Sequence, residues 1–167
     1  MIPRKPVVSD TGPIISPEKL TSGFQFIRKL YDEVIIPAAV LEELAHGEFE
    51  SGGAYLSHYH ATDILTIKQV SSFDLQTKTS HLDEGERQAI QLALNEELPL
   101  LIEEHAGRET AQKLGLHISG IAGQLNKAFQ QDLITAEEAK EKLNELLIAG
   151  RINTKVYGII AEAIEKQ

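Results

Sequence analysis

Short apolar segments alternate with longer amphipathic segments along most of this chain, and few folds accommodate such an alternation. Residues 7–9, 33–36 and 98–102 ("VVS", "EVII" and "LPLLI") are too short for helices and rich in β-branched or aliphatic residues, which is typical of buried strands. We expect two further strands at 64–70 and 116–119. Buried strands separated by helices form a parallel sheet that is covered on both faces. The sequence therefore predicts an α/β fold, a three-layer α/β/α domain with a central, mainly parallel sheet.

The predicted helices begin and end at recognisable signals. The first, over 13–29, is interrupted at Pro17 and again at Gly23. Thr135 and Glu138 form a capping box for one C-terminal helix, and Asn153 caps the last one. The other helices are expected at 38–46, 83–96, 105–114 and 122–131, with at most one short helix in the glycine-rich stretch that follows residue 46. We expect residues 1–167 to form one domain, with a C-terminal helical extension over about 133–167.

The composition excludes several classes of protein. The chain has no cysteine, which rules out disulfides and thiolate metal sites. It has no apolar run of about 18 residues, and its N-terminus lacks the apolar core of a signal peptide. We therefore expect a cytoplasmic protein that does not bind membranes. The formal charge of −9 opposes non-specific binding to nucleic acids unless a cation neutralises part of it.

Carboxylates follow the predicted strands or open the predicted helices. Asp10 comes directly after the first strand, at the carboxyl end of the sheet, where ligands bind in folds of this kind. Other acids in comparable positions are Glu42, Glu43, Asp83, Glu86, Glu103 and Glu104. Several carboxylates in one pocket repel one another and need a cation or protons. Oxygen ligands suit Mg²⁺ or Mn²⁺, and such an ion activates water for phosphodiester hydrolysis.

Each of these acids also has an ordinary structural explanation. Asp10 can cap the helix that begins near Pro13, and Glu43 can be a solvated helix residue. Asp83 and Glu86 fit a helix-capping pair with the spacing Asp-x-x-Glu. No single acid is specific, so the functional signal lies in their order and spacing.

Four segments together resemble the PIN-domain family, the fold of VapC-type toxin ribonucleases and other metal-dependent nucleases. "VVSDTGPII" resembles the family's first strand with its aspartate, and "LYDEVIIPAAVLEEL" its second strand, proline and helix. "LDEGERQAIQLA" is similar to the Leu-Asp-x-Gly-Glu block of an uncharacterised prokaryotic PIN-like subfamily. The segment from "LLIEEHAGR" to "ISGIAG" resembles the block that carries the last acid. The resemblance covers about residues 6–165.

The resemblance assigns the family's acids to Asp10, Glu43, Glu86 and Glu103, both as catalytic residues and as ligands of Mg²⁺ or Mn²⁺. Glu103 stands where the subfamily usually has aspartate. The implied activity is that of a metal-dependent endoribonuclease, a hydrolase of RNA phosphodiester bonds. The implied biological role is that of the toxin in a toxin–antitoxin pair.

Three further residues are expected to contact the substrate. Arg108 follows the last acids and suits a bidentate contact with a phosphate, although a salt bridge with Glu104 is an equal alternative. Thr11 and Ser119 offer hydroxyl groups close to the metal, although Thr11 can instead cap the first helix.

The main alternative is a non-catalytic PIN-like scaffold that binds RNA or a protein partner. A phosphatase of the haloacid-dehalogenase type is disfavoured, because it requires a second aspartate two residues after Asp10, where this chain has Gly12. The expected partners of the chain are RNA, an antitoxin protein and a second copy of the chain in a homodimer.

Overall fold

A five-stranded parallel sheet forms the centre of the molecule. The computed structural model describes residues 5–70 and 79–166. Within them the strand order is β3-β2-β1-β4-β5, and every neighbouring pair is parallel. The strands are β1 (Lys5–Ser9), β2 (Tyr31–Pro37), β3 (Leu65–Lys68), β4 (Leu100–Leu101) and β5 (Ile118–Ser119). This confirms the predicted parallel sheet, with shorter strands at its β5 edge than the sequence indicated.

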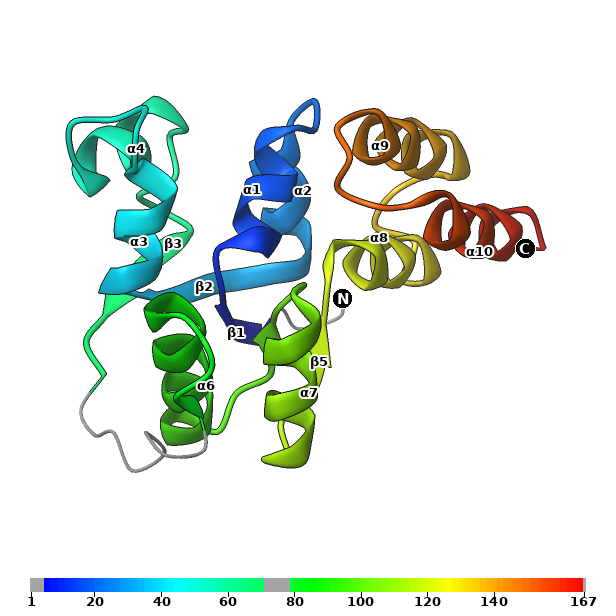
Figure 1. Cartoon of the computed structure of the whole chain (residues 1–167). Coiled ribbons are helices and arrows are strands. Elements are labelled where there is room, and N and C mark those ends of the chain that lie inside the picture. The colour runs from blue at the N-terminus through cyan, green and yellow to red at the C-terminus, as the bar shows by residue number, and fades with distance from the viewer. Residues whose placement is uncertain (1–4, 71–78, 167) are drawn as a thin grey trace.

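Successive strand residues enter two separate cores. Val7, Ile36 and Leu101 pack into the core on one face, whereas Val8, Ile35 and Leu100 pack into the core on the other face. This is the two-residue alternation of a strand that is apolar on both sides. Figure 1 shows α6 and α7 against one face of the sheet and α1, α2 and α3 against the other. The three-layer α/β/α prediction is therefore confirmed.

The helices match the predicted ones closely. Their bounds are α1 (Gly12–Glu18), α2 (Gly23–Leu30), α3 (Ala38–Ala45), α4 (Gly52–His58), α6 (Glu84–Glu96), α7 (His105–Lys113), α8 (Ile121–Gln130), α9 (Ala136–Ile148) and α10 (Thr154–Glu165). The first break comes one residue after Pro17 rather than at it. Gly23 then starts α2 so close to the Pro17 carbonyl that a side chain there would overlap it.

The C-terminal helices α8, α9 and α10 lie together beside the β5 edge of the sheet (Figure 1). Thr135 accepts a hydrogen bond from the Glu138 amide, and Asn153 accepts one from the Val156 amide, as the predicted caps require. The boundaries of one domain over 1–167 stay a prediction. No helix in the described part of the chain is both long and apolar enough to cross a bilayer.

Candidate active site

Five carboxylates gather at the carboxyl end of the sheet, and they come from four separate segments of the chain. Asp10 follows β1, and its backbone amide donates to the Leu101 carbonyl of β4 at 2.9 Å. Glu43 lies in α3, which follows β2 directly. Asp83 caps α6 and Glu86 lies in its first turn, whereas Glu104 is the residue before α7. The topology of the sheet thus brings together residues that are far apart in the sequence.

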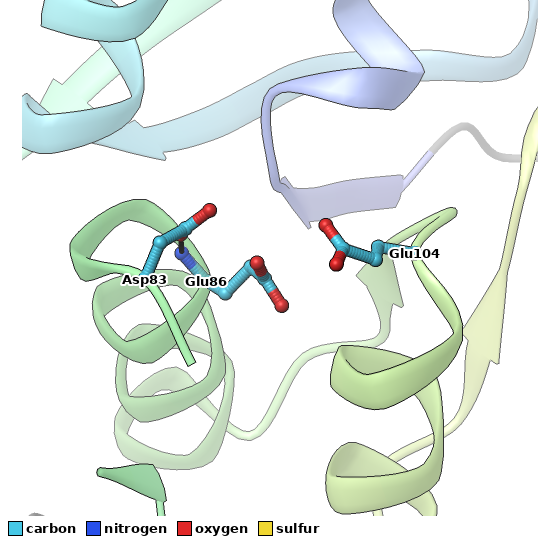
Figure 2. A group of neighbouring side chains, drawn as sticks. All are labelled: Asp83, Glu86 and Glu104. Atoms are coloured by element: carbon cyan, nitrogen blue, oxygen red, sulfur yellow. Dashed lines mark hydrogen bonds between the residues drawn. The ribbon is translucent and has the colours of Figure 1, made fainter. Parts of the chain in front are cut away.

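Asp83, Glu86 and Glu104 form the centre of this group. Each offers a carboxylate oxygen, and these oxygens all lie within 4.8 Å of one another. Figure 2 shows Glu104 reaching from the turn before α7 toward Glu86, which points away from α6. Asp83 Oδ1 also accepts a hydrogen bond from the Glu86 amide at 2.8 Å, so the predicted capping pair is present as well. The capping and the functional interpretations of these two acids are therefore compatible.

Asp10 and Glu43 complete the group. Burial is the main reason that the pKa of Asp10 is raised to about 7; the charges of Glu43, Asp83 and Glu104 contribute to the rise, and a hydrogen bond from the Thr11 amide opposes it. Asp10 is only 6% exposed. Thr11 Oγ1 donates to Glu43 Oε2 at 2.5 Å, so this hydroxyl orients an acid and does not cap α1.

Glu86 is the other buried acid, with 3% of its surface exposed. Burial first, and then the neighbouring Asp83, Glu104 and Asp10 carboxylates, raise the pKa of Glu86. Burial also raises the pKa of Glu43, although its hydrogen bond from Thr11 opposes the shift. Asp10 and Glu86 form the floor of the group, whereas the other three acids are exposed at its rim.

Two buried oxygens in this floor lack a partner. Among the described residues, Asp10 Oδ1 and Glu86 Oε2 accept no hydrogen bond although both are inaccessible to water. A buried acceptor without a partner is costly, so a native protein tends to satisfy it with an ion, water or ligand. A set of carboxylate oxygens without nitrogen or sulfur donors suits Mg²⁺ or Mn²⁺. The residues present therefore fit a divalent cation.

Two glycines make room for the acids. A Cβ atom at Gly107 would lie 2.8 Å from Glu86 Oε2, and one at Gly85 would overlap the Glu43 carboxylate. Both glycines lie inside helices, where glycine is unfavourable. The glycines in "DEGE" and "HAGR" thus leave space for carboxylates that pack closely against these helices.

Glu103 does not join the five carboxylates. Its Oε2 accepts a hydrogen bond from Arg151 Nη2 at 2.9 Å, and its Oε1 accepts one from Ser16 Oγ at 3.2 Å and one from the Ile121 amide at 3.3 Å. Among the described residues, it is the neighbouring Glu104 whose carboxylate lies within 4.8 Å of those of Asp83 and Glu86.

The three predicted substrate contacts lie in two places. Thr11 is beside the acids, as described above. Arg108 and Ser119 line a cavity of about 660 Å³, together with Gly120, Arg151 and Glu103, the residue before Glu104. Arg108 Nη1 donates to the Ile102 carbonyl at 2.8 Å, and no ion pair with Glu104 is present in this described region.

The comparisons with known proteins point to one family. A family model described as PIN domain matches residues 6–166, which is nearly the whole chain. Neither a curated protein nor a solved structure matched the chain. PIN domains are generally nucleases that use divalent metals, which agrees with the acidic group at the carboxyl end of the sheet. The chain belongs to the PIN-domain family and has a fold of the nuclease type.

Proposed function

We propose that this protein is an Mg²⁺- or Mn²⁺-dependent ribonuclease that hydrolyses phosphodiester bonds in RNA. The observation that carries the proposal is the pair of buried, unpartnered oxygens, Asp10 Oδ1 and Glu86 Oε2, within a group of carboxylates. Without a cation, such a group must hold protons at neutral pH to limit its repulsion. The group can hold a cation without a rearrangement of the chain, because the carboxylates already lie close together.

The proposed ligands are Asp10, Glu43, Glu86 and Glu104. Asp10 is the central ligand of this set, since the charges of both Glu43 and Glu104 raise its pKa and its side chain is buried beneath them. Thr11 orients Glu43 through its hydroxyl. A bound ion would activate water and stabilise the negative charge that develops on a phosphate. The assignment of Glu103 as a ligand stays the competing prediction, and a substitution pair described below separates the two.

Arg108 and Ser119 are proposed to hold a phosphate of the RNA strand next to the scissile bond. Both line the same cavity, which Glu103 also lines, and the Arg108 side chain is half-buried there. A guanidinium suits a phosphate because it donates two parallel hydrogen bonds. Its anchoring bond to the Ile102 carbonyl uses Nη1.

The test combines metal binding with cleavage. The metal-free protein and the variant Asp10→Asn are titrated with Mn²⁺ by calorimetry, and both are incubated with single-stranded RNA in Mn²⁺ or in a chelator. We expect the native protein to bind Mn²⁺ and cleave RNA only with the metal, and Asp10→Asn to do neither while remaining folded. Cleavage by Asp10→Asn would contradict the proposal.

Other outcomes identify the alternatives. Native protein that binds neither Mn²⁺ nor Mg²⁺, yet binds RNA or a protein, would be a non-catalytic PIN-like scaffold. An antitoxin partner and a homodimer stay predictions that the resemblance supports, and a cytoplasmic location stays a prediction from the composition.

A further inference from the structure

Arg151 joins three points that surround the acidic group. It lies in the turn between α9 and α10, more than 130 residues after β1. Its Nε donates to Ser16 Oγ at 2.9 Å, and its Nη2 donates to the Gly12 carbonyl at 3.1 Å and to Glu103 Oε2 at 2.9 Å. The side chain is 26% exposed, so these bonds are partly shielded from water.

Two of the three partners lie in α1, which follows Asp10, and the third lies in the turn that carries Glu104. Gly12 follows Asp10 by two residues and begins α1, and Ser16 lies in the same helix. Glu103 directly precedes Glu104 in the turn from β4 to α7. Close packing reinforces the link, because a Cβ atom at Gly12 would lie 2.9 Å from Glu103 Oε2. A single guanidinium thus connects the start of α1 to the residue next to Glu104.

We propose that Arg151 is a positioning residue for the metal site. It holds the β1–α1 turn and the β4–α7 turn at a fixed separation, so that Asp10 and Glu104 face the same ion; this rests on the function proposed above. Within the described part of the chain, Arg151 forms no hydrogen bond or ion pair with any of the five carboxylates. The C-terminal helical pair is in this way part of the site, although it contributes no ligand.

The direction of the effect distinguishes positioning from electrostatics. Removal of a positive charge near an acidic site favours the binding of a cation, because a repulsive interaction is lost. Loss of positioning weakens the binding, because the carboxylates no longer converge. A weaker Mn²⁺ affinity after removal of Arg151 therefore cannot come from charge alone.

The experiment compares two perturbations of the link with a matched control. Arg151→Met removes the guanidinium and keeps most of the side-chain length, whereas Gly12→Ala disturbs the same contact without a change in charge. Arg28→Met is the control, because Arg28 likewise joins a carboxylate, Asp63, to a backbone carbonyl, that of His60, and is 22% exposed. Mn²⁺ affinity is measured by calorimetry, and backbone hydrogen exchange is measured on the metal-free proteins.

We expect Arg151→Met and Gly12→Ala to lower the Mn²⁺ affinity at least about tenfold, and Arg28→Met to leave it within about twofold of the native value. Exchange at residues 11–16 and 102–105 should become faster in the first two variants only. Arg151→Lys should not restore the affinity, since a single ammonium cannot reach all three partners.

Two results would overturn the inference. Unchanged or tighter Mn²⁺ binding by Arg151→Met would show that Arg151 does not position the ligands. If the native protein binds no Mn²⁺, the proposed function fails, and hydrogen exchange then decides alone: equal exchange in Arg151→Met and Arg28→Met refutes the positioning role.

Discussion

Ionisation of some carboxylates in this protein is unfavourable in the folded state, and the fold does not require these acids. Asp10 is buried among like charges, and its pKa of about 7 means that ionisation is far less favourable in the folded chain than in the unfolded chain. Exposed acids with a cationic neighbour behave in the opposite way: Arg28 lowers the pKa of Asp63. Unfavourable ionisation that survives in a native protein is typical of functional sites.

The first prediction is that Asp10→Asn stabilises the metal-free protein. Because the folded pKa is raised from 3.8 to about 7, the folded state binds the Asp10 proton more tightly, and the free energy of unfolding falls as pH rises between these values. The shift corresponds to roughly 4 kcal/mol at most. Asn cannot ionise, so the variant should be more stable than the native protein at about pH 8 and similar at about pH 4.

Urea unfolding in a chelator at both pH values measures this difference. Glu43→Gln is the comparison, since Glu43 is exposed and its smaller burial should give a smaller gain. A native protein that is more stable than Asp10→Asn at the higher pH would show that the Asp10 carboxylate is not crowded.

The second prediction separates Glu104 from Glu103. Glu104→Gln should weaken Mn²⁺ binding at least about tenfold, because an amide replaces a charged ligand. Glu103→Gln should weaken it less, because its amide oxygen can still accept the hydrogen bond from Arg151. Calorimetric titrations of the two variants measure the ranking, and the reverse ranking would restore Glu103 as the ligand.

Sequence reasoning at this scale finds some site residues and not others for a physical reason. Asp10 directly follows a short buried strand, and Glu86 follows a capping aspartate, so their positions could be predicted. Glu103 and Glu104 are adjacent acids in one turn, and only the path of the backbone decides which one faces the site. Arg151 lies in a turn with no local motif, and its role depends on a contact across 48 residues.

At the scale of helices and strands, the sequence predicts which elements are present better than it predicts where each one begins and ends. Val7 and Val8 pack on opposite faces of the sheet. Because such a strand is buried on both faces, consecutive apolar residues predict it correctly. The bounds depend on pairing: β4 is limited to Leu100–Leu101, because it pairs with Ser9 and Ser119 at one end and with Val8 and Ile118 at the other. Such bounds are set by contacts with neighbouring strands, and the local sequence does not indicate them.

The third prediction concerns the glycine in α7. Ala at a helix interior is favoured over Gly by about 0.5–1 kcal/mol, so Gly107→Ala would be stabilising if space were available. The new methyl group would lie 2.6 Å from Ile102 Cδ1 and 2.8 Å from Glu86 Oε2. We therefore expect Gly107→Ala to lower the melting temperature and to weaken Mn²⁺ binding by displacing Glu86.

Gly158→Ala is the control for this substitution. Gly158 also lies inside a helix, α10, and has open space where a Cβ atom would be. Gly158→Ala should raise the free energy of unfolding by about 1 kcal/mol and leave the Mn²⁺ affinity unchanged. Equal effects of the two substitutions on metal binding would contradict the packing of α7 against Glu86.

For the whole molecule, the charge of −9 and the acidic site pose one problem. The proposed nuclease must approach a polyanion, yet a net charge of −9 opposes this approach, and the five acids concentrate negative charge at the proposed site. A bound divalent cation would reduce this repulsion at the site, because it would neutralise the carboxylates and attract a phosphate. Arg108 adds a guanidinium in the cavity that it lines. Recognition of RNA is thereby expected to depend on the metal and on Arg108 rather than on overall charge.

The last prediction is that Mn²⁺ affinity rises with pH. Below its pKa of about 7, Asp10 holds a proton that the cation must displace, and the raised pKa of Glu86 acts in the same direction. For each displaced proton, the affinity should rise about tenfold per pH unit below the pKa and level off above it. Calorimetry of the native protein at about pH 6, 7 and 8, in buffers with different ionisation enthalpies, measures both the affinity and the protons released. An affinity that stays constant over this range, with no proton release, would mean that the ion displaces no proton, so that Asp10 and Glu86 are either already ionised or not among its ligands.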